Sequence, residues 1–222
     1  MANALVMSGH LRTFKDIAEE VKHFVSLNEL DVYLYIWDED NQADIDYVVK
    51  TLKPVKWLAE KNDTLFLGQA VSYPGTGMTN TLKDVSANKL MEMPVNEDMQ
   101  MGLSLGMALN GTVPISIYPR WNFLLLAANQ VVNHLDKAKA MSDGKYTPKV
   151  IIRTAIGSQR PLHPQHQHIA DFTAGFRALC DTVDVIKLDE PNQIFEAYQY
   201  AYNRTDNRST ILVEWGDFYN EK

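Results

Sequence analysis

The sequence predicts an α/β protein with three layers and a mostly parallel sheet in a larger domain, preceded by a small β-α-β-α-β unit. Short β-branched and aliphatic runs alternate along the chain with segments whose apolar residues recur at helical spacing. Of the 222 residues, 45% are apolar and 22% are charged, which is typical of a folded globular chain. No Gly/Ser-rich linker interrupts the pattern, so we expect two packed units, residues 1–61 and 62–222.

The first unit is expected to contain two helices between three strands. A proline cannot donate to a helical ladder, so we expect the second helix to end before Pro54. The expected strands are 4–7, 31–36 and 55–59, and the expected helices are 14–27 and the segment around 45–52.

The second unit repeats the same alternation over a longer stretch. Its expected strands are 64–67, 114–118, 150–152, 183–186 and 210–214, and its expected helices are 98–109, a segment capped by Asn122 that runs to Ala138, and 192–202. Gly102 and Gly106 lie four residues apart in the helix at 98–109. Each glycine costs about 1 kcal/mol in helix propensity, so we expect close backbone packing there.

Charge and composition exclude several classes of protein. The 28 acidic residues outnumber the 21 basic ones, and the net charge of -7 argues against a nucleic-acid binder. No apolar run approaches the roughly 20 residues that span a bilayer, and the first residues do not resemble a signal peptide. The single cysteine, Cys180, fits a reducing compartment. We therefore expect a cytoplasmic protein that binds neither membranes nor nucleic acid.

An ordered set of short motifs runs from Asp63 to about Tyr219. The set comprises Thr64-Leu65-Phe66-Leu67-Gly68, Met93-Pro94-Val95-Asn96-Glu97, Gly102 and Gly106, Gly111 and Pro114, Val150-Ile151-Ile152-Arg153 with Gly157, and Gln165-His166. In this order the motifs resemble the pyrimidine-binding domain shared by transketolases and the β subunits of 2-oxo-acid dehydrogenase E1 components. The resemblance implies a thiamine-diphosphate-dependent enzyme that acts on 2-oxo acids or ketoses.

The resemblance implies a catalytic role for Glu97. Thiamine chemistry needs a carboxyl group that shares a proton with the pyrimidine ring nitrogen and so promotes the imino tautomer. Glu97 lies between a strand-like segment and an apolar helix, where burial is plausible. The alternative is an ordinary acid at a helix N-terminus, stabilised by the helix dipole.

Three further residues match positions around the cofactor in this family. The resemblance implies that Phe123 stacks on the aminopyrimidine, that Pro119 lines the same pocket, and that His166 hydrogen-bonds the substrate or intermediate. For Phe123 the alternative is a core residue at the start of a buried helix. For the histidines the alternative is a zinc site built from His163, His166, His168 and Asp171.

The other half of such a cofactor site is not recognisable. The family holds magnesium and the diphosphate with a Gly-Asp-Gly motif followed by an Asn, and neither Asp143-Gly144 nor Gly216-Asp217 fits that pattern. We therefore expect no metal ligand in this chain. The resemblance implies an α-type partner subunit that carries the diphosphate-binding domain and the magnesium, in a homo- or hetero-oligomer. The alternative is a non-catalytic assembly or regulatory module on the same fold.

Residues 1–61 show a second resemblance. Leu5 to Phe14 and Asp31 to Asp38 resemble the start of a glycosyltransferase-like family. Ser8-Gly9-His10 with Arg12 could meet a nucleotide diphosphate at a helix N-terminus, and Asp38-Glu39-Asp40 superficially suggests a metal motif. The segment is too short for a whole sugar-nucleotide site. We therefore interpret it as a truncated structural remnant, with sugar-nucleotide binding as the third-ranked hypothesis.

Overall fold

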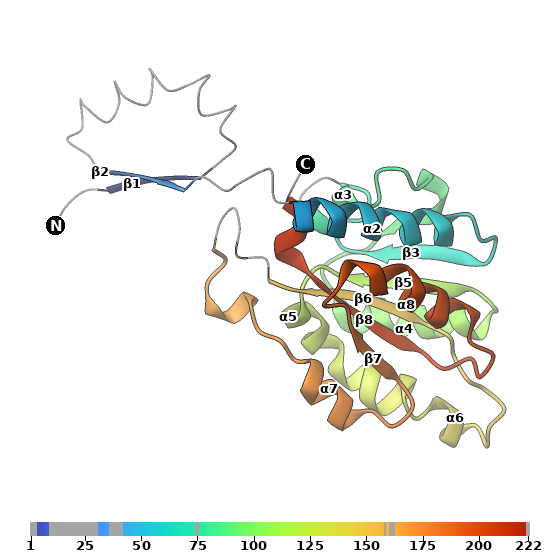
Figure 1. The fold of residues 1–222 in the computed structure, drawn as a ribbon. Helices are drawn as coiled ribbons and strands as arrows, with labels where there is room; N and C mark the ends of the chain where they lie inside the picture. Colours follow the sequence, from blue (N-terminus) through green and yellow to red (C-terminus); the bar gives the residue numbers. More distant parts are fainter. Residues whose placement is uncertain are drawn as a thin grey trace.

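The computed structural model describes residues 4–8, 31–35, 42–73, 76–157, 159 and 163–220 (Figure 1). Strands β1 (Ala4–Ser8) and β2 (Asp31–Tyr35) pair in parallel, with Ala4 opposite Asp31. The two strands predicted at 4–7 and 31–36 are confirmed. The helix predicted over 14–27 lies outside the described residues.

Helix α2 (Gln42–Ala59) contradicts the strand predicted at 55–59. It continues through Pro54 as a single helix. A proline inside a helix costs about 3 kcal/mol in helix propensity, but burial on the large sheet offsets this cost. Val55 and Leu58 are both buried in the same core cluster as the helix α8 (Pro191–Asn203). The division of the chain near residue 61 stays a prediction.

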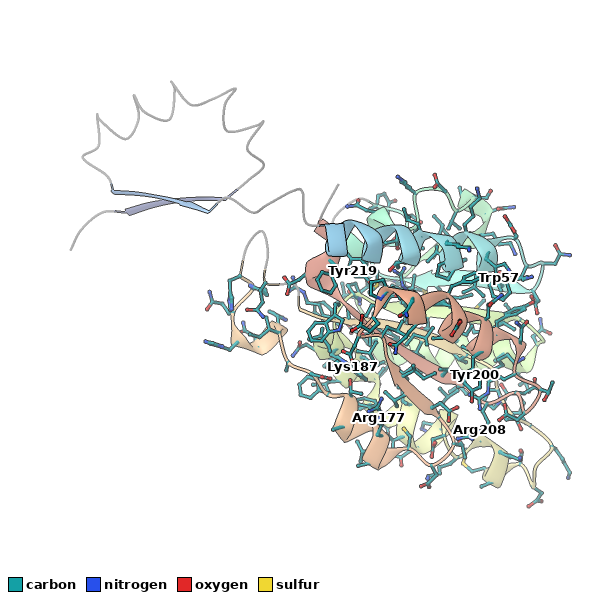
Figure 2. The ribbon with its side chains drawn as sticks, viewed as in Figure 1. Trp57, Arg177, Lys187, Tyr200, Arg208 and Tyr219 are labelled. Atoms are coloured by element: carbon teal, nitrogen blue, oxygen red, sulfur yellow. The ribbon has the colours of Figure 1, made fainter. Side chains whose placement is uncertain are left out.

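Aromatic side chains join α2 to α8. The ring of Trp57, labelled in Figure 2, meets Phe195 and Tyr202 edge to face, with centroids 5.9 and 5.4 Å apart. The Lys61 ammonium lies 4.4 Å from the Trp57 ring centroid, and the Tyr202 hydroxyl donates to Asp63 at 2.7 Å. A strand at 55–59 would forfeit these contacts, so tertiary packing decides the conformation of this segment.

In the described part of the chain, six strands form one sheet in the order β4-β3-β5-β6-β8-β7. Every pair in it is parallel, with Phe66 opposite Ile115 and Ile152 opposite Ile211. The strands are β3 (Thr64–Gly68), β4 (Leu90–Glu92), β5 (Val113–Tyr118), β6 (Ile151–Ile156), β7 (Asp184–Lys187) and β8 (Thr210–Trp215). The mostly parallel sheet predicted from the sequence is confirmed, and β4 is a short edge strand that the sequence did not predict.

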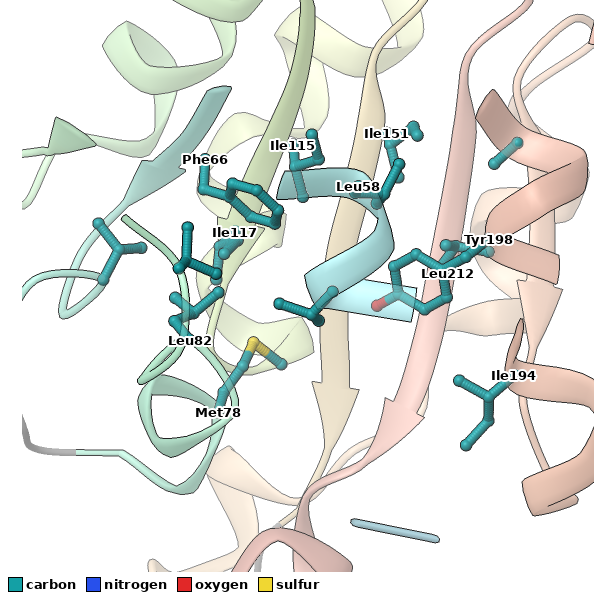
Figure 3. Close-up of a cluster of buried hydrophobic side chains, with 14 of the residues drawn as sticks. Leu58, Phe66, Met78, Leu82, Ile115, Ile117, Ile151, Ile194, Tyr198 and Leu212 are labelled. Atoms are coloured by element: carbon teal, nitrogen blue, oxygen red, sulfur yellow. The ribbon is translucent and has the colours of Figure 1, made fainter. Parts of the chain in front are cut away.

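Helices cover both faces of this sheet (Figure 1). One face carries α2, α3 (Gly77–Asn80), α8 and η5 (Gly216–Asn220), whose apolar side chains meet Phe66, Ile117 and Leu212 (Figure 3). The other face carries α4 (Glu97–Leu109), α5 (Trp121–Leu124) and α7 (Thr173–Leu179) around Ile152 and Val213. The predicted three-layer α/β fold is therefore confirmed. No helix among the described residues is long and apolar enough to cross a membrane.

The segment after β5 is less regular than the predicted helix. It is divided into α5, η2 (Leu125–Ala127), a π-helical stretch η3 (Gln130–Leu135) and α6 (Ala138–Met141). Asn122 lies inside α5 instead of capping it. The predicted apolar stripe is nevertheless directed inward, with Leu124, Val131 and Leu135 buried.

Helix α4 buries several polar side chains and exposes several apolar ones. Glu97, Gln100 and Ser104 are buried, whereas Met99, Leu103 and Leu109 are 45%, 39% and 67% exposed. A Cβ placed on Gly102 or Gly106 would meet no described atom within 4 Å. The close backbone packing predicted at these glycines is therefore not made within the described residues.

Candidate functional site

Four neighbouring strands end at the same edge of the sheet. In a parallel sheet the carboxyl ends of all strands face one side, and loops from that side commonly carry binding groups. Gln69 follows β3, and the loop after β4 leads to Glu97. Pro119 follows β5, and the chain after β6 leads to η4 (His166–His168). Glu97, Pro119 and the η4 segment that contains His166 thus each follow a strand that ends at this edge.

Glu97 is the first residue of α4 and is 4% exposed. Asn96 caps the helix by accepting a hydrogen bond of 2.9 Å from the backbone amide of Met99. The Gln69 side-chain amide donates to Glu97 Oε1 at 2.9 Å. In the described residues no group donates to Oε2 of Glu97. A buried carboxyl with one oxygen held and one available can exchange a proton with a ligand.

Tyr118 connects the end of β5 to the same helix turn. Its hydroxyl is 3.4 Å from the backbone carbonyl oxygen of Glu97. Burial raises the pKa of Tyr118 above its ordinary value, and the nearby carboxyl groups of Glu97 and Asp98 add to the shift. Tyr118 therefore stays a protonated donor. Pro119, the next residue, is half-buried beside it.

Phe123 lies in α5 and contacts His168. The two ring centroids are 5.8 Å apart with the planes tilted by 45°. In α5 and η4, three buried polar atoms have no hydrogen-bond partner within the described residues: Trp121 Nε1, Asn122 Oδ1 and His168 Nδ1. Unsatisfied polar atoms next to a half-buried aromatic ring would suit a ligand that is both flat and polar.

His166 is the first residue of η4, and its predicted role stays a prediction. It is exposed, and its ring contacts His163, with centroids 5.8 Å apart. The preceding Gln165 has φ of 73°, a conformation that is costly for a residue with a side chain. Within the described residues, no group of three or more His, Cys, Asp or Glu could hold a metal, so the zinc alternative finds no support.

The sequence missed Gln69, His168 and Arg120 as members of this edge. Arg120 follows Pro119 and is half-buried. Burial lowers the pKa of its guanidinium, and the Asp217 carboxylate opposes that shift. Asp217, which follows β8, also accepts a hydrogen bond from the backbone amide of Gln159. For Gln69 and Arg120 the only signal in the sequence was their position, one and two residues after the end of a strand.

The N-terminal candidates cannot be placed. Gly9, His10, Arg12 and the acidic cluster 38–40 lie outside the described residues. Ser8 ends β1.

Comparison with known sequences matches the chain to a protein family. The profile of the transketolase pyrimidine-binding domain matches residues 53–216. The chain is 32% identical over 104 residues to the mitochondrial pyruvate dehydrogenase E1 component subunit beta of Ascaris suum, covering 47% of this chain and 28% of that protein. It is 30% identical over 168 residues to the corresponding subunit of Gracilaria tenuistipitata var. liui, covering 73% of this chain and 50% of that protein. The chain thus spans half or less of these relatives.

Comparison with solved structures gives the same fold. A split-gene transketolase, described as an inactive β4 tetramer, superposes with a TM-score of 0.57 at 14% identity. The match covers 78% of this chain and 51% of that one. At this level of identity the likeness concerns the fold.

Proposed function

The chain belongs to the transketolase pyrimidine-binding domain family, and from this membership we propose that it is the E1 β-like, pyrimidine-binding subunit of a thiamine-diphosphate-dependent enzyme acting on 2-oxo acids or ketoses. The observation that carries the proposal is the buried carboxyl of Glu97 at the first turn of α4. It lies at the carboxyl edge of the sheet and receives its hydrogen bond from a neutral amide. This environment suits a group that exchanges a proton with a ring nitrogen.

The described residues fit the pyrimidine half of the cofactor. Phe123 offers a half-buried aromatic ring, and base-like stacking on such a ring is worth about 1–3 kcal/mol. The polar atoms of Asn122 and His168 that have no partner within the described residues could bond the edges of an aminopyrimidine. We propose that Pro119 lines the same pocket and that a partner subunit supplies the diphosphate and magnesium site.

Each residue then has one task. When bound, thiamine diphosphate supplies a carbon nucleophile for the carbonyl of the substrate. Glu97 passes a proton to and from the pyrimidine ring nitrogen, and Phe123 orients the ring by stacking. We propose that His166 donates a hydrogen bond to the substrate. Tyr118 holds the first turn of α4 against β5 through the Glu97 carbonyl.

The exposed surface of α4 favours contact with a partner subunit. Past the exposed Asp98 of its first turn, α4 exposes Met99, Leu103 and two glycines, and such a largely apolar face is typical of a surface that becomes buried on association. The homologous E1 β subunits imply an α-type partner, and the solved neighbour is a split-gene transketolase whose β4 tetramer is described as inactive. We propose that α4 contacts the chain that completes the site.

The test is turnover in the complex with the partner chain. Glu97→Gln should lower kcat by about 100-fold or more, because the amide cannot exchange the proton. Glu196→Gln, on the exposed side of α8, is the matched control and should keep full activity. Full activity in Glu97→Gln with an unchanged melting temperature would disprove the assigned role.

A further inference from the structure

The side chain that holds Glu97 is itself held in place. Gln69 follows Gly68, the last residue of β3, and a Cβ on that glycine would lie 2.4 Å from the backbone oxygen of Ile117. Because Gly68 has no Cβ, β3 can lie close to β5 at the residue just before Gln69. From there the Gln69 amide reaches Glu97 Oε1 at 2.9 Å.

Glu92 fixes the loop that follows Gln69. Its carboxylate, at the end of β4, accepts hydrogen bonds from three successive backbone amides: Ala70 at 2.6 Å, Val71 at 2.9 Å and Ser72 at 2.8 Å. Ala70 has φ of 53°, in the left-handed region that a residue with a Cβ adopts at a cost. Three amides directed at one anion compensate for that cost and leave the loop a single conformation.

These contacts form a continuous path from the edge strand to the buried carboxyl. Glu92 sets the backbone of residues 70–72, that backbone sets the direction of Gln69, and Gln69 binds one oxygen of Glu97. A glutamine amide has no charge to lose near neutral pH, so its hydrogen bond does not compete for the proton that Glu97 exchanges.

We propose that Gln69 is a positioning residue, fixed by Glu92, which orients the Glu97 carboxyl so that its second oxygen faces the ring nitrogen of an aminopyrimidine. This inference rests on the proposed function. It adds a residue that supports the proton exchange without touching the ligand. A site held to within about half an ångström depends on such supporting hydrogen bonds.

The experiment uses the full chain without a partner. The probe is 4-amino-5-hydroxymethyl-2-methylpyrimidine, and a matched second probe carries CH in place of the ring nitrogen that would face Glu97. Binding is measured by ligand-observed NMR for the unmodified chain, Gln69→Leu, Gln69→Glu and Glu97→Gln. Gln193→Leu, at an exposed position of α8, is the matched control.

We expect both Gln69 variants to bind the pyrimidine about tenfold more weakly, as for the loss of one hydrogen bond to a charged group. The CH analogue should bind all five proteins equally, because it makes no use of Glu97. Gln69→Glu keeps the size of the side chain, so a loss there with an unchanged melting temperature is not a packing effect.

The experiment distinguishes failure of the positioning role of Gln69 from failure of the proposed function. If Glu97→Gln weakens pyrimidine binding and the Gln69 variants do not, Gln69 is not a positioning residue and the proposed function stands. An equal loss of both probes in the Gln69 variants would also overturn the positioning role, since it would indicate general disruption. If the unmodified chain binds neither probe, or Glu97→Gln binds the pyrimidine as well as the unmodified chain does, the proposed function is wrong and this inference with it.

Discussion

Arg153 and Glu214 form a completely buried ion pair between β6 and β8. The Arg153 Nη2 lies 2.8 Å from Glu214 Oε2, and its Nη1 donates to Thr81 Oγ1 at 2.8 Å. The Tyr198 hydroxyl donates to the same carboxylate. Burial opposes the charge on Arg153, but the Glu214 carboxylate outweighs it and raises the pKa of the guanidinium. Arg153 therefore stays charged inside the core.

Removing one partner of this pair should be far more harmful than removing a surface charge. Glu214→Gln leaves a buried guanidinium without its counter-ion, so we expect a loss of about 3–5 kcal/mol in the free energy of unfolding. Urea unfolding followed by circular dichroism measures it. Lys187→Met removes a more exposed partner of Asp171 and should cost about 1 kcal/mol or less. Equal losses in the two variants would contradict this assignment.

At the scale of elements, Asp136 ties the π-helical stretch η3 to the start of β7. It is buried and follows Leu135. Its carboxylate accepts from the backbone amides of Thr182 at 2.6 Å and Val183 at 2.9 Å. Burial would raise the pKa of Asp136, but hydrogen bonds from Lys137 and three backbone amides outweigh burial and hold the pKa at about 2.

This shift predicts a defined loss of stability in acid. The unfolded-state pKa of an aspartate is about 3.9, so the contribution of about 2 kcal/mol is complete above that pH and disappears as the pH falls through about 2. Asp136→Asn should therefore be less stable than the unmodified chain at pH 7, and the difference should shrink between pH 4 and pH 2. Denaturant unfolding across this range measures it, with the exposed Asp84→Asn as control. A difference that is constant with pH would rule out the electrostatic origin.

At the scale of the whole molecule, the exposed face of α4 belongs to the proposed assembly. Leu103→Lys places a charge on that face, where Leu103 is 39% exposed. We expect an unchanged melting temperature of the isolated chain and at least tenfold weaker association with the partner subunit, because a charge at the centre of an apolar interface is costly to desolvate. Sedimentation of the mixed chains measures the association.

The matched control is Leu179→Lys on α7, a leucine that is 52% exposed away from α4. Unimpaired association in Leu103→Lys would place the partner on another surface. A lowered melting temperature would mean that Leu103 serves the fold of the chain itself.

The sequence by itself determined the alternation of strands and helices and the identity of the family. Strands such as β3, β5 and β8 are buried on both faces, so their apolar runs are visible without any knowledge of their neighbours. Glu97 was found in the same way, because its motif is local. Local patterns are readable when the physical cause lies within the segment.

Tertiary structure decided what depends on distant residues. Residues 55–59 are helical because α8 lies beside them, and the Gln69 side chain lies against Glu97 only because β3 and β4 are neighbours. His168 rather than His166 meets Phe123 because of the turn that the loop makes after Gln165. Such pairings join residues that are far apart in the chain, and their free energy comes from burial that no local pattern encodes.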